Sequence, residues 1–153
     1  MPQVLTSAER ALLAEARTAT LATIDPDGRA RLVPICFVVI DDTLWSPLDE
    51  KTKVVADPRA LARVRDIVAR PEVTLLVDRW SEDWSDLAWV RLRGLASLVD
   101  PSDVPARVLT ALRAKYPQYA AHDLEARPAL RIASARATAW SAADVERGTP
   151  PHR

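Results

Sequence analysis

The sequence predicts a mainly β protein, a small antiparallel barrel of about six strands with helical caps. Three observations predict this class. The hydrophobic period changes from 3.6 to 2 after a short first helix. Short apolar segments then recur, separated by turn residues such as "DPDG" at 25–28. The 153 residues, 48% hydrophobic and 27% charged, fit a single folded domain over 1–153, with a frayed tail from about 146 to 153.

The first elements follow from capping and turn signals. Thr6 and Glu9 form a capping box, which predicts that a short helix begins there. Alternating residues around 19–25 predict a strand, and the "DPDG" turn connects it to a second strand from about 29 to 40. The segment "DDTLWSPL" supplies another turn and a short third strand.

The second half of the chain alternates helices with longer strands. Asp57 and Pro58 are an N-cap and first-turn pair for a helix over 58–70. Ser102 or Asp103 starts a further helix. The remaining strands are expected at 72–77, 88–99 and 130–140.

Several functional classes lack their sequence signals. The single cysteine excludes an internal disulfide, and neither histidine has a partner at metal-ligand spacing, so no metal site is expected. The nucleophile-elbow, P-loop and dinucleotide-binding motifs are missing from the sequence. A net charge of +0 argues against general nucleic-acid binding. No apolar run is long enough to span a membrane, and the N-terminus does not read as a secretory signal, so a cytoplasmic protein is expected.

The segment 32–40 is apolar on both faces, which is unusual for a strand that leaves a hairpin. One face can line the barrel interior, and we expect a second copy of the chain to cover the other. Pro34 cannot donate to a β ladder, so the strand is expected at an edge, or bulged or opened there.

Cations and aromatic residues remain as candidate binding groups. Lys51 and Lys53 precede a helix that carries Arg63, and such a group could hold a phosphate or carboxylate. A solvated basic loop is the alternative. On the strand 88–99, Trp89 and two arginines share one face, which predicts contact with a planar anionic ligand or another subunit, or an ordinary amphipathic surface.

Four stretches together resemble the split β-barrel flavin-binding proteins related to pyridoxamine 5′-phosphate oxidase. They are "ATLATIDPDGRARLVPICFV", "LWSPLDEKTK", "ALARVRDIVARPEVTLLVD" and "EDWSDLAWVRLRGLA". The sequence is most similar to the branch that uses the deazaflavin coenzyme F420, found in actinobacteria. The resemblance implies a homodimer of split barrels with two cofactor sites in the interface.

The resemblance also implies roles for particular residues. Carried over position by position, the cofactor-binding residues are Val33, Pro34 and Ile35 against the ring, Trp45, Ser46 and Pro47 on the next strand, Lys51, Lys53 and Arg63 at the phosphate-bearing tail, and Trp84 and Trp89 closing the pocket from either subunit. No side chain is implied as a nucleophile, and no metal is implied. The residues that hold pyridoxal phosphate in true pyridoxamine oxidases have no clear match here, which argues against vitamin B6 oxidation.

The resemblance predicts an oxidoreductase that transfers a hydride between reduced F420 and an unsaturated small-molecule substrate. Three alternatives stay open at this point. The first is an FMN-binding pyridoxamine phosphate oxidase-like flavoprotein, the second is a non-catalytic F420 or flavin carrier, and the third is a dimeric interaction module whose tryptophans are interface anchors.

Overall fold

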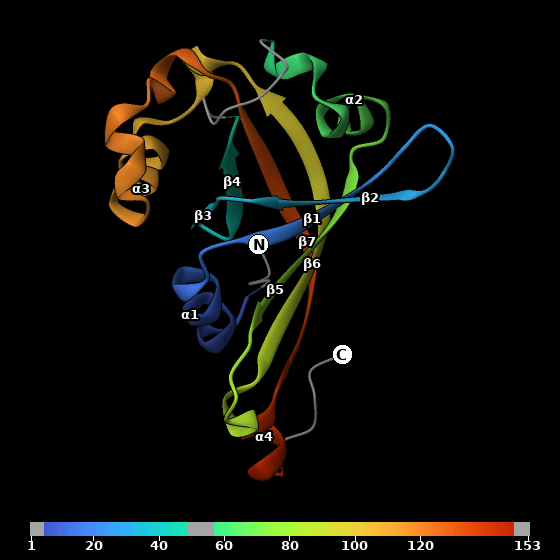
Figure 1. The fold of residues 1–153 in the computed structure, drawn as a ribbon, viewed down its shortest axis with the longest axis vertical. Helices are drawn as coiled ribbons and strands as arrows, with labels where there is room; N and C mark the ends of the chain where they lie inside the picture. Colours follow the sequence, from blue (N-terminus) through green and yellow to red (C-terminus); the bar gives the residue numbers. More distant parts are fainter. Residues whose placement is uncertain (1–4, 49–56, 149–153) are drawn as a thin grey trace.

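The computed structural model describes residues 5–48 and 57–148, and its antiparallel sheet has seven strands in the order β2-β1-β5-β6-β7-β4-β3 (Figure 1). The strands are β1 (Ala19–Ile24), β2 (Ala30–Ile35), β3 (Val38–Ile40), β4 (Thr43–Pro47), β5 (Glu72–Arg79), β6 (Ala88–Val99) and β7 (Ala129–Ser141). The helices are α1 (Ser7–Glu15), α2 (Ala62–Ala69), α3 (Ala106–Lys115) and α4 (Ala142–Glu146). The mainly β class with helical caps is confirmed.

The first helix and first hairpin form where the sequence predicts them. The Thr6 hydroxyl accepts the Glu9 backbone N–H at 3.2 Å, and the Glu9 carboxylate accepts the Thr6 N–H at 2.9 Å, so the capping box is complete. Gly28 has a φ of 80°, a conformation that glycine adopts without a steric penalty, and closes the turn between β1 and β2.

The predicted count of about six strands is wrong, because the expected strand over 29–40 is divided into two. β2 ends at Ile35 and pairs with β1, whereas β3 begins at Val38 and pairs with β4. These two strands form opposite edges of the sheet, and only Cys36 and Phe37 connect them. The sheet therefore curls until its edges meet. Pro34 lies on an edge strand, as its missing donor predicts.

A tyrosine hydroxyl satisfies the backbone where the chain passes from one edge to the other. The hydroxyl of Tyr116 accepts the Phe37 backbone N–H at 3.0 Å. Its own proton points to the carbonyl of Arg17 at 2.9 Å or of Phe37 at 3.2 Å. Because Phe37 is fully buried, these bonds replace the ladder that the backbone loses there.

Two helices begin later than predicted. Asp57 caps a 3-10 turn, Pro58–Ala60, and α2 begins after an extended residue, Leu61. The helix expected from Ser102 or Asp103 begins at Ala106, because the residue before a proline is disfavoured in the helical region and Pro105 follows Val104 directly.

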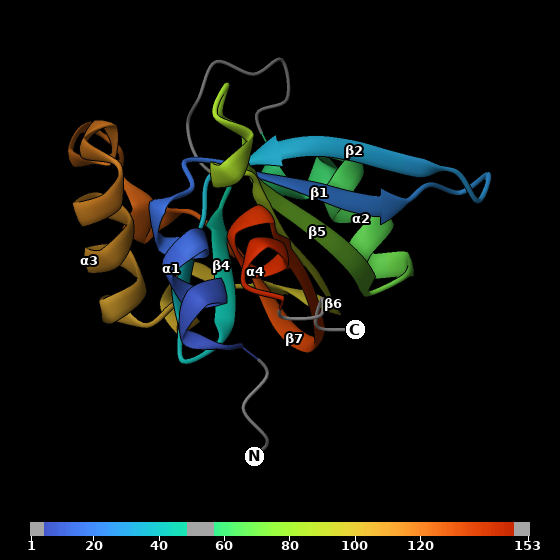
Figure 2. The same ribbon diagram turned by 90° about the horizontal axis from the view of Figure 1, so that it is seen from below.

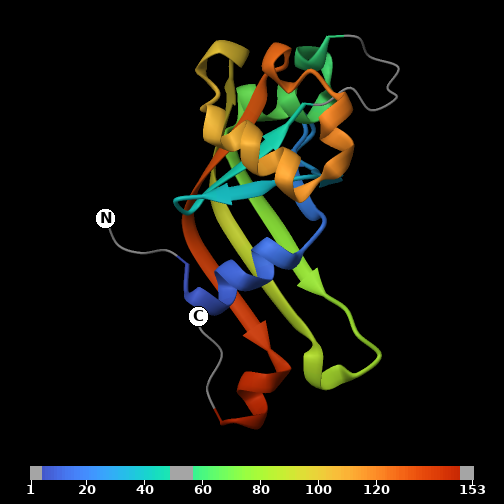
Figure 3. The ribbon, with the colours of Figure 1, turned by 90° about the vertical axis from the view of Figure 1, so that its left-hand side faces the viewer.

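The curled sheet has an interior face and an outer side. α1 and α2 pack on the interior face, where Leu12 and Ile67 meet strand residues such as Leu75 and Leu92. α3 covers the outer side of β3 and β4 with a second core cluster that includes Trp45. Figure 2 shows α2 and α3 at opposite ends of the curl, and Figure 3 shows α1 lying across the long strands β5, β6 and β7. None of the described helices has the length and apolar character needed to cross a membrane.

Candidate functional site

The outward side of β6 carries one tryptophan and two arginines. Val90 and Leu92 are 2% and 1% exposed and point into the core, whereas Arg91 and Arg93 are exposed and Trp89 is half-buried on the opposite side. The alternation predicted for this strand is confirmed. The guanidinium carbon of Arg91 lies 5.6 Å from the centre of the Trp89 ring, within the range of a cation–π contact.

The strand register extends this surface on to β7. Trp89 lies opposite Trp140, Arg91 opposite Thr138, and Arg93 opposite Arg136. Directly opposed side chains in an antiparallel pair have Cβ atoms roughly 5 Å apart. The two tryptophans and the arginines therefore form one continuous group.

The same surface becomes apolar toward the β2 edge. Pro34 is in register with Thr20, and Thr20 with Leu76, so these residues form a row across β2, β1 and β5. Leu76 is 41% exposed and Leu32, on the next row, is 65% exposed. We call the outward side of β2, β1, β5, β6 and β7 between Leu32 and Trp140 the outer face. Its exposed apolar side chains are of the kind found at binding interfaces.

A β-bulge shapes the middle of the outer face. The register of β6 and β7 shifts between Arg93 and Gly94. A Cβ atom on Gly94 would lie 2.3 Å from the carbonyl oxygen of Ala133, so only glycine allows the two backbones to approach this closely. The extra residue on β7 is Ala135, and its insertion brings Arg136 opposite Arg93.

The three residues expected against a cofactor ring do not share one environment. Pro34 is exposed on the outer face. Ile35 is 5% exposed in the core, and Val33 is half-buried and packs against that core. Of the three, only Pro34 presents its side chain to a ligand on the outer face.

The segment Trp45 to Pro47 is buried. Trp45 is 7% exposed in the cluster beneath α3, Ser46 is 2% exposed, and Pro47 is buried beside them. Their cofactor contact stays a prediction, and in this chain α3 and the barrel already occupy their surroundings.

The predicted tail-binding cations are only partly described. Lys51 and Lys53 lie outside the described residues. Arg63 is half-buried on α2 next to Val64, whose side chain enters the core. A phosphate site formed by these three residues stays a prediction.

The tryptophans expected to close the pocket lie at one end of the long strands. Trp84 begins the 3-10 turn Trp84–Asp86, between β5 and β6, and is 69% exposed. Trp89 belongs to the outer face. The sequence reasoning missed Trp140 and Arg136. Arg136, Thr138 and Trp140 alternate along β7 in the same way as Trp89, Arg91 and Arg93 along β6. This alternation in the sequence could have revealed both missed residues.

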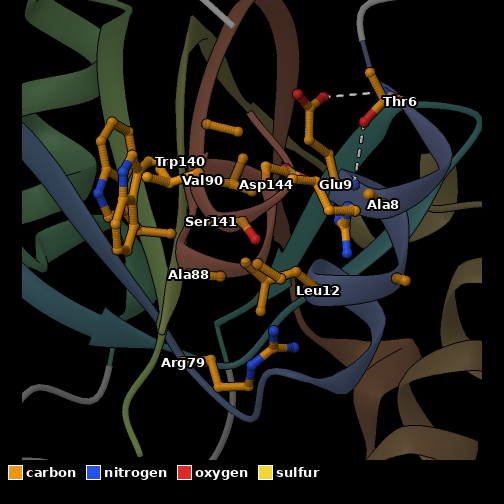
Figure 4. Close-up of a pocket in the computed structure, with 16 residues that line it drawn as sticks. Thr6, Ala8, Glu9, Leu12, Arg79, Ala88, Val90, Trp140, Ser141 and Asp144 are labelled. Atoms are coloured by element: carbon orange, nitrogen blue, oxygen red, sulfur yellow. Dashed lines mark hydrogen bonds and ion pairs between the residues drawn. The ribbon is translucent and has the colours of Figure 1, made fainter. Parts of the chain in front are cut away.

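A cavity of about 460 Å³ lies on the other side of the long strands, between α1, α4 and the ends of β6 and β7 (Figure 4). Leu12 and Arg79 line it, and the ring of Trp140 lies on the far side of the strand. Its charged groups have partners. Arg79 donates to the carbonyl of Asp86 at 2.8 Å, and Arg147 to Asp144 at 2.6 Å. The cavity thus offers a ligand few free charges.

A groove of about 970 Å³ lies between α1, α3 and the turn after β3. Arg10 donates two bonds of 2.8 Å to Asp42 beside it. Burial lowers the pKa of Lys115 to about 8, and Arg17 acts in the same direction. The ammonium of Lys115 donates to the Leu13 carbonyl at 3.1 Å and lies 3.8 Å from the centre of the Phe37 ring, so it ties α3 to α1.

A buried carboxylate fixes the hairpin that carries the β2 edge. Asp66 on α2 is 4% exposed and accepts bonds of 2.7 Å from the Thr23 hydroxyl and from the guanidinium of Arg31. Burial alone would raise the pKa of Asp66, but the bonds from Arg31 and Thr23 outweigh it and the pKa is lowered. No group of three or more histidine, cysteine or acidic side chains suited to a metal ion occurs among residues 5–48 and 57–148.

Comparison with known protein families identifies the family of this curled sheet. Residues 5–143 match the family model described as pyridoxamine 5′-phosphate oxidase. The chain belongs to the pyridoxamine 5′-phosphate oxidase family. A comparison with curated proteins finds no match.

Solved structures of the family's fold agree with this assignment. The conserved hypothetical protein Rv2991 of Mycobacterium tuberculosis is 25% identical, covers 98% of this chain and 91% of its own, and has a TM-score of 0.73. A protein described as an F420 reductase is 19% identical over 87% of this chain and 98% of its own, with a TM-score of 0.63. The heme storage protein HutZ from Vibrio cholerae is 14% identical over 91% of this chain and 95% of its own, with a TM-score of 0.67. The last two similarities establish the fold and leave the ligand open.

Proposed function

We propose that this protein is a homodimeric oxidoreductase that binds a flavin-type cofactor on the outer face, with coenzyme F420 as the first candidate and FMN as the second. The observation that carries the proposal is the composition of the outer face. It presents an apolar edge and two tryptophans to solvent, and no described helix covers it. The family assignment and the F420 reductase among the structural neighbours support the choice of cofactor.

The outer face fits a flat conjugated ring. Leu32 and Leu76 expose apolar area, and a ring placed there would remove that area from water, which contributes roughly 25 cal/mol per Å². The half-buried indoles of Trp89 and Trp140 add flat surfaces for stacking. A second copy of the chain placed over Leu32 and Pro34 would close the seam and exclude water from it.

The cofactor supplies the redox chemistry when bound, because its reduced ring donates a hydride to an activated double bond. The residues of this chain bind, orient and shield. Pro34 offers no backbone donor, so its surface toward the ring is apolar. The bond between Arg31 and Asp66 fixes the hairpin and hence the position of the β2 edge. Arg63, Lys51 and Lys53 are proposed to hold the anionic tail.

A paired titration tests the cofactor assignment. Purified protein is titrated with F420 and with FMN, and quenching of the fluorescence of each cofactor gives the dissociation constants. We expect tighter binding of F420. Trp89→Ala should weaken it about tenfold, because stacking on an aromatic side chain is worth roughly 1–3 kcal/mol.

Trp80→Ala is the matched control, since Trp80 is 66% exposed in the loop after β5 and is not one of the residues that the sheet pairs with Trp89 or Trp140. Its dissociation constant should stay within about twofold of the wild type. Preference for FMN would move the protein to the FMN-binding group. Binding of neither cofactor, or equal losses in both tryptophan variants, would contradict the proposed site.

Oxidation of bound reduced cofactor by added acceptors then separates an enzyme from a carrier. HutZ, described as a heme storage protein, shows that the fold also serves storage. An enzyme should reoxidise the reduced cofactor faster with at least one unsaturated acceptor than in its absence. A uniform rate across the acceptors would favour a carrier.

A further inference from the structure

We propose that Arg91, Arg93 and Arg136 form an anion-binding subsite on the outer face that recognises a planar conjugated substrate bearing carboxylate groups. The inference rests on the proposed function and names the substrate class of the same site.

The sheet places two arginines directly opposite each other. Arg93 and Arg136 are both exposed and are paired in register, and like charges in this position destabilise a sheet. Neither forms an ion pair or hydrogen bond through its side chain with any residue in 5–48 or 57–148. Arg91 is on the same side of β6, and among these residues its side chain forms a cation–π contact with the Trp89 ring but no ion pair or hydrogen bond. An anion between the guanidinium groups would relieve their repulsion.

The β-bulge is the feature that creates this pair. Gly94 pairs with Ser134, so without the bulge the next pair would be Arg93 and Ala135, and Ala135 is small and neutral. Because of the inserted residue, Arg136 lies opposite Arg93 instead. The bulge requires the β6 backbone at Gly94 to lie close to the β7 backbone at Ala133. Bulges of this kind redirect side chains next to binding sites.

The surroundings indicate the chemistry of the ligand. Each guanidinium offers five N–H donors in a planar fork that matches a carboxylate. Trp89 and Trp140 lie along the strands from the arginines and offer flat stacking surfaces. Asp78, opposite Trp89, and Glu72, opposite Leu95, border the subsite on β5 and disfavour ligands with anionic groups spread beyond the arginines.

The subsite adjoins the residues proposed for the cofactor ring, because Arg91 lies opposite Leu76 and beside the Trp89 ring, but it is distant from the β2 edge. Pro34 lies on β2, and β1 and β5 stand between it and β6, so strand spacings alone place the arginines about 14 Å from the β2 edge. A substrate held by its carboxylates at β6 and β7 could extend along the sheet toward the ring.

The test uses naphthalene-2,6-dicarboxylate as the probe and its neutral diamide as the chemical control, with calorimetric titration of the full chain. We expect Arg93→Gln combined with Arg136→Gln to weaken dicarboxylate binding at least thirtyfold and to leave diamide binding unchanged. Arg29→Gln combined with Arg70→Gln removes the same charge from two other exposed arginines and should change binding less than twofold. The dissociation constant for F420 is measured on all variants and should stay within threefold.

The other outcomes are distinct. Equal weakening by both double variants would reduce the effect to net charge and overturn the subsite. Loss of F420 binding in Arg93→Gln with Arg136→Gln would assign these arginines to the anionic groups of the cofactor and overturn the substrate role. A shift to monomer mass with unchanged dicarboxylate binding would show that the arginines pair with acids of a second copy, and would also overturn it. Selective loss of the dicarboxylate in a protein that binds neither cofactor would support the subsite while refuting the proposed function.

Discussion

Tyr116→Phe tests how the curled sheet is closed. The hydroxyl is the acceptor for the buried Phe37 N–H at 3.0 Å, where the chain crosses from the β2 edge to the β3 edge. Phenylalanine keeps the ring, which is 6% exposed and 5.5 Å from the Tyr119 ring, but it removes the hydroxyl. The substitution therefore isolates the hydrogen bonds from the packing.

The expected loss follows from one unsatisfied buried donor and one lost donated bond. An unsatisfied buried group costs about 1–3 kcal/mol, and a neutral hydrogen bond contributes about 1 kcal/mol. We expect the free energy of unfolding to fall by about 3 kcal/mol in urea titrations, and the melting temperature by roughly 6–12 °C for a chain of this length.

Thr110→Val is the control, because the Thr110 hydroxyl donates to the Ala106 carbonyl at 3.1 Å on the exposed side of α3. Its effect should stay below about 0.5 kcal/mol. A loss in Tyr116→Phe no larger than in the control would refute the reasoning that this hydroxyl sustains the strand crossover.

Three further predictions concern other parts of the structure. Gly94→Ala should lower the free energy of unfolding by about 3 kcal/mol, because the new Cβ would clash with the Ala133 carbonyl. Gly28→Ala should lower it by about 1 kcal/mol, because Gly28 has open space around it but a φ of 80°. Equal losses of stability in thermal unfolding would contradict the bulge geometry. Asp66→Asn should lower the free energy of unfolding by about 2 kcal/mol at pH 7. Because the pKa of Asp66 is lowered in the folded state, this contribution is present above about pH 4 and is lost as the pH falls through the folded-state pKa. The difference in stability between the wild type and Asp66→Asn should therefore vanish at low pH. A difference that persists there would exclude the charged pair as its cause. Leu76→Asp should convert the proposed homodimer to a monomer in light scattering without changing the circular dichroism spectrum, and an unchanged dimer mass would remove Leu76 from the interface.

Local signals in the sequence predicted most elements correctly. The capping box at Thr6, the turn at Gly28 and the alternation of 88–99 depend on neighbouring residues, and the structure has all three. The prediction of one strand over 29–40 was wrong. An unbroken apolar run has the same pattern whether it forms one strand with one partner or two strands with different partners. Its break at Cys36 and Phe37 depends on Tyr116, which is distant in the sequence.

The candidate site was predictable only where it follows strand periodicity. Trp89 was identified because its face alternates with an aliphatic one. The sequence around Trp45 gives no indication that this residue is less accessible to a ligand than Trp89, but α3 covers it in the structure. The packing of a helix that is distant in the sequence cannot be predicted from neighbouring residues. The pairing of Arg93 with Arg136 depends on a one-residue register shift, which alternation alone cannot reveal.

A crystal structure of the protein with coenzyme F420 would show on which side of the sheet the cofactor binds. We expect the ring to lie on the outer face between Pro34 and Trp89, in a seam covered by a second copy of the chain. A ring bound in the cavity between α1 and α4, or in the groove between α1 and α3, would contradict the claim and transfer the site to the other side of the sheet.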